Sequence, residues 1–185
     1  RADINGEMLQ FTVGPDIPAS TFNANRTRHE GIEAALEWTP IDWLRLRQVY
    51  AYSSFRFRGD VEFANNRLPI VPKQTYRAEL RLGTDALHIA PNLEWVPDGP
   101  FADYRGQVCT PGYALVGVTG GAQLANGIDA FVDVRNLTGK KAIGDISAAI
   151  VATSGSAIYY PVERRAVSAG VRARFWWTGA GRVSL

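Results

Sequence analysis

The chain has 185 residues, which is the size of one ordinary domain or of a piece of a larger one. Its composition, 46% hydrophobic and 21% charged, excludes a disordered tail, and its net charge of +2 argues against nucleic acid as the main partner. The single cysteine, Cys109, excludes a disulfide framework within the chain and a cysteine-based zinc site. No segment has the character of a transmembrane helix, and the start at Arg1 without a targeting signal indicates a truncated chain.

Apolar and polar residues alternate with period two in segments of about ten residues, which predicts about eight strands in an all-β chain. In chain order the segments are residues 1–13, 25–38, 43–56, 74–83, 86–96, 112–123, 128–136 and 164–175. The Asn5–Gly6 pair is either a hairpin turn or a glycine within the first strand. In segment 43–56 the phase reverses before Phe55, which predicts a bulge or the end of the strand there.

The connections between these segments alternate between long and short. The long ones are residues 14–25, 58–73, 97–111 and 137–163, and the short ones are 39–42, 83–85 and 124–127. Outer-membrane barrels show this pattern, with short periplasmic turns and long external loops. The predicted fold is therefore an antiparallel transmembrane β-barrel segment of about eight strands.

Alternation alone does not tell a membrane barrel from a soluble one, because the two differ only in which face meets water. Two observations favour the membrane barrel. The apolar face carries aromatic residues near strand ends, as an interfacial girdle requires. The polar face has nearly balanced charges, as suits a lumen. The predicted luminal wall comprises Glu33, Arg45, Arg47, Arg77, Glu79, Arg81, Glu94, Asp133, Arg135, Arg172 and Arg174, with Glu37 and Asp129 on the same face. Either a hydrogen-bonded network that packs the wall, which is favoured, or solute passage explains these charges.

Three stretches resemble TonB-dependent outer-membrane receptors. The closing segment 166–175, preceded by Tyr159–Pro161, resembles their last strand, in which alternate apolar residues lead to a phenylalanine. Residues 131–141, with Asn136-Leu137-Thr138, are similar to the penultimate strand and its "NLT" turn, and residues 27–33 to the "R-x-G-x-E" strand. The resemblance implies an assembly signal formed by Val167, Ala169, Val171, Ala173 and Phe175. Residues 1–175 are then barrel, and residues 176–185 are an extension that the family normally lacks.

The resemblance also implies a function. The chain is expected to be the C-terminal barrel part of a receptor in the outer membrane of a Gram-negative bacterium, surrounded by outer-membrane lipid. Such a receptor takes up a ferric siderophore or a similar scarce nutrient, powered by the TonB complex through an N-terminal plug. The plug and the remaining strands are missing from this chain. A self-contained eight-stranded barrel with a structural or adhesive role, and a soluble ligand-binding barrel, remain as alternatives.

The long loops carry the candidate ligand residues, since aromatic rings and guanidinium groups stack on and hydrogen-bond an anionic iron chelate. They are Tyr104, Arg105, Tyr159, Tyr160, Arg164 and Arg165. For Tyr159 and Tyr160 the favoured interpretation is that they anchor the strand in the outer interface. His29 and His88 lie on separate strands, so neither a metal site nor a cofactor is expected. No catalytic constellation is present, and the chain is not expected to be an enzyme.

Overall fold

The computed structural model describes residues 1–14, 17–153, 155–156 and 158–174. These residues form strands and no helix. Accordingly, no helix of the described part is long and apolar enough to cross a membrane.

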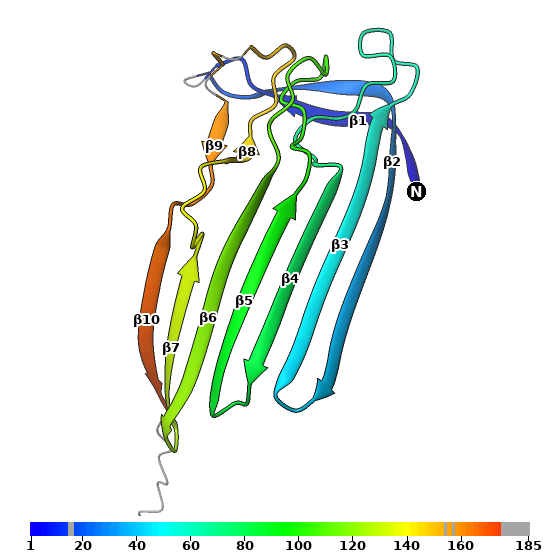
Figure 1. The fold of residues 1–185 in the computed structure, drawn as a ribbon. Helices are drawn as coiled ribbons and strands as arrows, with labels where there is room; N and C mark the ends of the chain where they lie inside the picture. The colour runs from blue at the N-terminus through cyan, green and yellow to red at the C-terminus, as the bar shows by residue number, and fades with distance from the viewer. Residues whose placement is uncertain (15–16, 154, 157, 175–185) are drawn as a thin grey trace, which may run out of the picture.

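Eight antiparallel strands form one sheet in the order β1-β2-β3-β4-β5-β6-β7-β10 (Figure 1). Their bounds are β1 Ala2–Phe11, β2 Ser20–Ile41, β3 Leu44–Phe57, β4 Gln74–Gly83, β5 Leu87–Val96, β6 Tyr113–Ala125, β7 Ile128–Arg135 and β10 Ala166–Ala173. The prediction of an all-β chain with eight sheet strands is confirmed. Two short strands that the sequence did not indicate, β8 (Ile143–Ile146) and β9 (Tyr159–Pro161), pair within the last long connection.

The short turns gather at one end of the sheet and the long connections at the other (Figure 1). We call these the turn end and the loop end. The turns are residues 42–43, 84–86 and 126–127, and the connections at the loop end are residues 12–19, 58–73, 97–112 and 136–165. Among the described residues β1 pairs only with β2 and β10 only with β7, so the sheet is open.

Two expectations about strand limits are wrong. No bulge interrupts β3 before Phe55, because its pairing with β2 is regular from Trp38↔Leu46 to Thr27↔Phe57. The phase of hydrophobicity reverses because Phe55 and Phe57 point to the polar face, where loops cover them. The first long connection is also shorter than predicted, because β2 begins at Ser20 and not after Asn25.

A change in the phase of the alternation within β2 explains why the sequence did not predict the first residues of this strand. Ala24 and Thr27 are 1% and 0% exposed although three positions separate them, so the alternation shifts between these residues. The shift lies opposite Gly6 in β1, whose φ is +66°. Gly6 is therefore a glycine within the strand, and the left-handed backbone that it adopts disfavours other residues.

The sheet separates its side chains onto two faces. The register places Glu37 opposite Arg47, Arg77 opposite Glu94 and Asp129 opposite Arg172, all on one side, which we call the polar face. The other side is the apolar face. Its side chains Ile32, Leu87 and Val167 are 66%, 67% and 66% exposed. Such a continuous exposed apolar surface indicates contact with another apolar medium.

Candidate functional site

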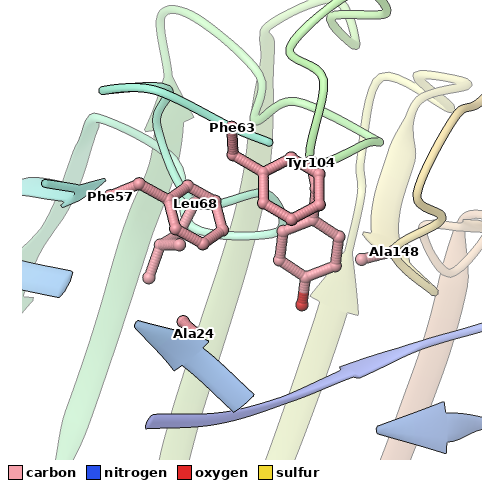
Figure 2. Packing of buried hydrophobic residues seen from close by; sticks show 6 residues of the cluster. All are labelled: Ala24, Phe57, Phe63, Leu68, Tyr104 and Ala148. Carbon is pink, nitrogen blue, oxygen red and sulfur yellow. The ribbon is translucent and has the colours of Figure 1, made fainter. Parts of the chain in front are cut away.

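The long connections fold over the polar face at the loop end and form a cap, by which we mean the described residues of 58–73, 97–112 and 136–165. Its core is an aromatic cluster, drawn in Figure 2, that contains Phe57, Phe63 and Tyr104. The rings of Phe57 and Phe63 stack with 4.8 Å between centroids. Because Phe57 belongs to the polar face of β3, the cap identifies that face as the interior of the fold.

Asp103 joins two connections of the cap. Its side chain is 0% exposed, and its Oδ1 accepts hydrogen bonds from the backbone N–H groups of Gln107 (2.9 Å) and Val108 (3.3 Å). Its Oδ2 accepts from the N–H of Ala152, 3.3 Å away in the last connection. A backbone bridge between Asp103 and Ala149 runs alongside. The two connections are thus held as one unit.

Tyr104 lies inside the cap and not at its surface. It is 2% exposed, its ring packs edge-on against Phe22 at 5.0 Å, and its hydroxyl donates to the carbonyl of Gln10 (2.8 Å). This placement differs from the expectation that the ring stacks on a ligand, because the ring is buried among other rings and its hydroxyl is already hydrogen-bonded. Tyr104 instead fastens the cap to β1.

Tyr104 is expected to make the stability of the cap depend on pH in the alkaline range. Burial, with the charge of Glu7, raises its pKa from 10.0 to about 12. A phenol whose pKa is raised on folding stabilises the fold fully below pH 10, and that contribution is lost as the pH rises through 12. We expect the difference in unfolding free energy between the wild type and Tyr104→Phe to be constant below pH 10. Above pH 10 it should fall by about 1.4 kcal/mol per pH unit, measured by urea unfolding of the intact protein. A difference that stays constant to pH 12 would contradict this.

Tyr159 and Tyr160 lie on β9. Tyr159 packs against a second buried cluster that includes Ile146 and Ile158. Tyr160 is 54% exposed, and its hydroxyl lies 3.0 Å from that of Ser147. A hollow of about 330 Å³ opens beside it between β8–β9 and the end of β1. Residues that line the hollow include Phe11, Ile17, Ile70, Ser147, Ile158 and Tyr160.

The predicted arginines lie on the surface of the cap, with Arg105 in one connection and Arg164 and Arg165 next to each other in another. Arg105 makes an ion pair with Glu62 (2.8 Å) and lies over the ring of Phe63. Arg164 and Arg165 are exposed in the segment that leads from β9 to β10. Among the described residues no hydrogen bond or ion pair joins them to Tyr160.

Ion pairs cover the polar face below the cap. Glu94 accepts from Arg77 (2.9 Å) and from the hydroxyl of Tyr113 (3.0 Å). Further pairs are Arg45–Glu37, Arg47–Glu37, Arg81–Asp85, Arg135–Asp133, Arg135–Glu163 and Arg174–Asp129. Within the described part of the chain, Glu33, Glu79 and Arg172 make no ion pair. Most of these side chains are partly exposed, so each pair stabilises the wall by about 0–1 kcal/mol.

Near the turn end the polar face carries a row of alternating glycines and rings that sequence reasoning missed. The register aligns Gly83, His88, Gly121, Phe131 and Gly170 across β4, β5, β6, β7 and β10. A Cβ on Gly121 would lie 2.5 Å from the ring of His88, and one on Gly170 would lie 2.7 Å from the ring of Phe131. Each ring therefore reaches across to the glycine of the next strand. Spacings within single strands carry no sign of such a row, because it runs across strands.

Comparison with known proteins identifies the fold. The family model described as "TonB dependent receptor-like, beta-barrel" matches residues 1–137. This chain belongs to the TonB-dependent receptor β-barrel family. Receptors of this family are transporters and not enzymes, as the sequence predicted. No curated protein matches the sequence.

Solved structures of TonB-dependent receptors share the fold of this chain. The ferric yersiniabactin uptake receptor FyuA of Yersinia pestis has a TM-score of 0.71 at 18% identity, over 85% of this chain and 25% of that one. The siderophore receptor PiuA of Acinetobacter baumannii has a TM-score of 0.67 at 16% identity, over 89% and 24%. The copper transporter OprC has a TM-score of 0.72 at 15% identity, over 94% and 28%. The chain thus spans about a quarter of the length of the structures that it matches.

The structure gives physical roles to two of the family-like motifs. In the "NLT" turn, Asn136 adopts a φ of +47°, and its side-chain amide donates to the carbonyls of Lys140 (2.9 Å) and Glu163 (2.8 Å). It thereby ties the start of the last connection to its end. In segment 27–33, a Cβ on Gly31 would lie 2.7 Å from the carbonyl oxygen of Tyr52, so only glycine fits there.

The proposed assembly signal is described except for its last member. Val167 and Val171 are 66% and 65% exposed on the apolar face of β10. Ala169 and Ala173 alternate with them on the same face. Phe175 and the extension 176–185 lie outside the described residues.

Proposed function

We propose that this chain is the C-terminal barrel part of an outer-membrane receptor that takes up a ferric siderophore or a similar scarce nutrient. The observation that carries the proposal is the family match over residues 1–137, joined by the siderophore receptors among the structural neighbours. Energy from the TonB complex would arrive through the N-terminal plug of such a receptor. The remaining strands would close the open edges of β1 and β10.

The two faces of the sheet support a place in the outer membrane. The exposed apolar face suits lipid, and the charged face with its cap suits a lumen. In this orientation the turn end is periplasmic and the loop end external. The open sheet argues against the self-contained eight-stranded barrel, because a closed barrel would pair β1 with β10.

The hollow beside Tyr160 is the ligand-contacting part that we propose for this chain. Tyr160 offers an exposed ring there, and its neighbour Tyr159 packs against the buried cluster that holds β9 in place. Arg105, Arg164 and Arg165 would add positive charge around the cap for an anionic chelate. Tyr104 would act indirectly by holding the cap in shape. The luminal charges would act as a packed network of the wall.

Uptake of radiolabelled iron tests the proposal. Cells that lack the gene should take up less of the ferric siderophore than complemented cells, and an uncoupler should abolish the difference. Tyr160→Ala in the intact protein should weaken uptake at low substrate concentration several-fold. Val61→Ala, which changes a fully exposed residue elsewhere in the cap, is the matched control and should not. Uptake that is independent of the gene would contradict the iron proposal. Gene-dependent uptake of copper instead would favour the cargo named for OprC.

A further inference from the structure

Arginines gather on the apolar side of the sheet at its loop end. Arg28 of β2 lies directly opposite Arg56 of β3, and Arg56 is bridged in turn to Arg67. One pair of residues further toward the loop end, the backbone N–H of Arg58 donates to the carbonyl of Arg26 (2.9 Å). We call Arg26, Arg28, Arg56, Arg58 and Arg67 the arginine patch.

The register fixes the face of this patch. Arg28 lies four residues from Ile32, and Arg56 lies four residues from Tyr52, so each shares a face with its apolar partner. The next residue on β2, His29, and its partner on β3, Phe55, point to the polar face, where their rings stack on each other. The patch therefore continues the apolar face upward and does not line the interior.

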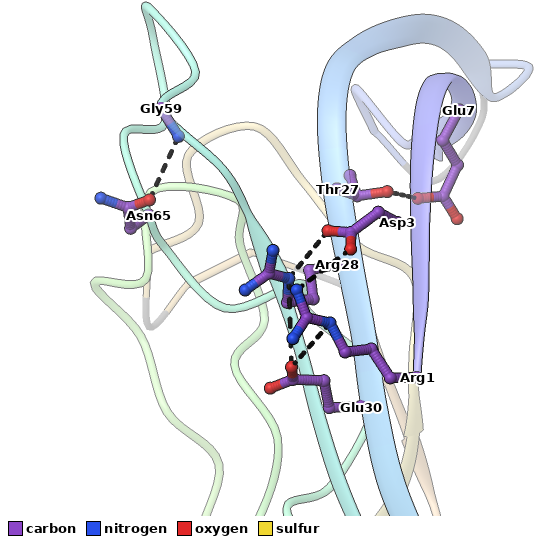
Figure 3. A network of polar contacts seen from close by, with 8 residues as sticks. All are labelled: Arg1, Asp3, Glu7, Thr27, Arg28, Glu30, Gly59 and Asn65. Atoms are coloured by element: carbon purple, nitrogen blue, oxygen red, sulfur yellow. Dashed lines mark hydrogen bonds and ion pairs between the residues drawn. The ribbon is translucent and has the colours of Figure 1, made fainter.

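Among the described residues, acidic side chains form ion pairs with the patch only at Arg28, and the carboxylate of Asp98 acts on Arg67 from a longer distance. Arg28 pairs with Asp3 at 2.8 Å and lies 3.9 Å from Glu30, which also pairs with Arg1 (Figure 3). In the part of the chain that the structure describes, the other four arginines make no ion pair. Burial and the charge of Arg56 lower the pKa of Arg67. Like charges placed opposite each other on strands are destabilising, so the patch favours an anion between its members.

The height of the patch identifies the medium around it. From Leu44 to Tyr52 the apolar face of β3 spans nine residues, about 27 Å along the strand and about 20 Å in height at a tilt of about 40°. This matches the apolar band of an outer-membrane barrel, with Tyr50 and Tyr52 as its aromatic belt. Arg56 lies about 10 Å higher, beyond the hydrocarbon and at the level of lipid headgroups.

We propose that the arginine patch binds the phosphate groups of an anionic lipid in the leaflet at the loop end. The guanidinium group suits this role because its planar fork makes paired hydrogen bonds to phosphate oxygens. Lipid phosphate is the anion that fits this position, because the patch lies on the apolar side, directly above the lipid-facing band, and away from the lumen. The proposal rests on the proposed membrane location.

Lipid retention by the intact protein tests the proposal. The protein is reconstituted into vesicles of phosphatidylcholine with or without phosphatidic acid, extracted, and examined by native mass spectrometry for bound lipid. The wild type should retain phosphatidic acid in preference to phosphatidylcholine. The double variant Arg56→Gln/Arg67→Gln should bind phosphatidic acid about tenfold more weakly or worse. The double variant Arg56→Lys/Arg67→Lys should keep part of the affinity. The matched control is Arg45→Gln/Arg47→Gln, which removes two arginines from the polar face of the same strand and should not change retention.

The outcomes separate this proposal from the one on which it rests. Insertion without a preference for phosphatidic acid, or an equal loss in both glutamine variants, would overturn the lipid site alone. Failure to insert into either kind of vesicle would overturn the membrane location and the lipid site together. A third outcome is that free inorganic phosphate competes with phosphatidic acid as effectively as added phosphatidic acid does. That result would assign the patch to a soluble anion and overturn the lipid site.

Discussion

Replacing Asp103 by alanine is expected to open the cap. The substitution leaves the N–H groups of Gln107, Val108 and Ala152 without their acceptor; the bond to Ala152 is buried and the other two are partly buried. Each unsatisfied buried donor costs about 1–3 kcal/mol, so we expect the free energy of cap opening to fall by about 3–5 kcal/mol. Hydrogen exchange of residues 97–112 and 146–152 in the intact protein measures this directly.

A graded pair of variants distinguishes this role from a general effect of charge. Asp103→Asn keeps one acceptor oxygen and should lose less than the alanine variant. Asp98→Ala removes an exposed carboxylate from the same connection and should leave the exchange unchanged. Equal protection in Asp103→Ala and Asp98→Ala would show that Asp103 does not hold the cap.

A second large effect is expected when an arginine is introduced on the apolar face of β2. Leu36 is 54% exposed and pairs with Gln48 near the middle of the apolar band. Leu36→Arg would place a charge in the hydrocarbon of the bilayer. Near the bilayer midplane this costs about 2–4 kcal/mol of stability. The free energy of unfolding of the intact protein in lipid vesicles should fall by that amount.

The neighbouring residue supplies the control. Ala35→Arg adds the same charge one position away on the polar face, between Glu33 and Glu37, and should cost little. Because Leu36 is exposed in the structure, its substitution loses little packing within the protein, so the cost should arise from the lipid. Equal costs for the two variants, or a larger cost at Ala35, would contradict the assignment of faces.

The sequence predicted the strands and the alternation of turns and loops because both depend on local spacing. Period two distinguishes the faces of each strand, and glycine, proline and polar residues mark the connections. It did not predict what lies over a face. In β3 the ring of Phe57 looked like a phase error because only the folded cap reveals that the polar face becomes apolar there.

The candidate site was predicted less well for the same reason. Tyr104 and Tyr160 look alike in sequence, as tyrosines in long connections, yet one is 2% exposed and the other 54%. The difference comes from Phe22, Phe57 and Phe63, which are distant in the chain and surround only Tyr104. Contacts of this range are set by the tertiary fold.

The rings of His88 and Phe131, which reach across to the glycines of the next strand, have a consequence for the passage of solutes through a closed barrel. A ring that lies against the backbone of the next strand takes up less of the bore than a ring that points toward the barrel axis. At the level of Gly121 and Gly170 the wall is therefore thin, and a hollow of about 550 Å³ opens there. For the receptor that we propose, we therefore expect a wide passage at this level and selection among solutes at the cap, at the opposite end of the sheet.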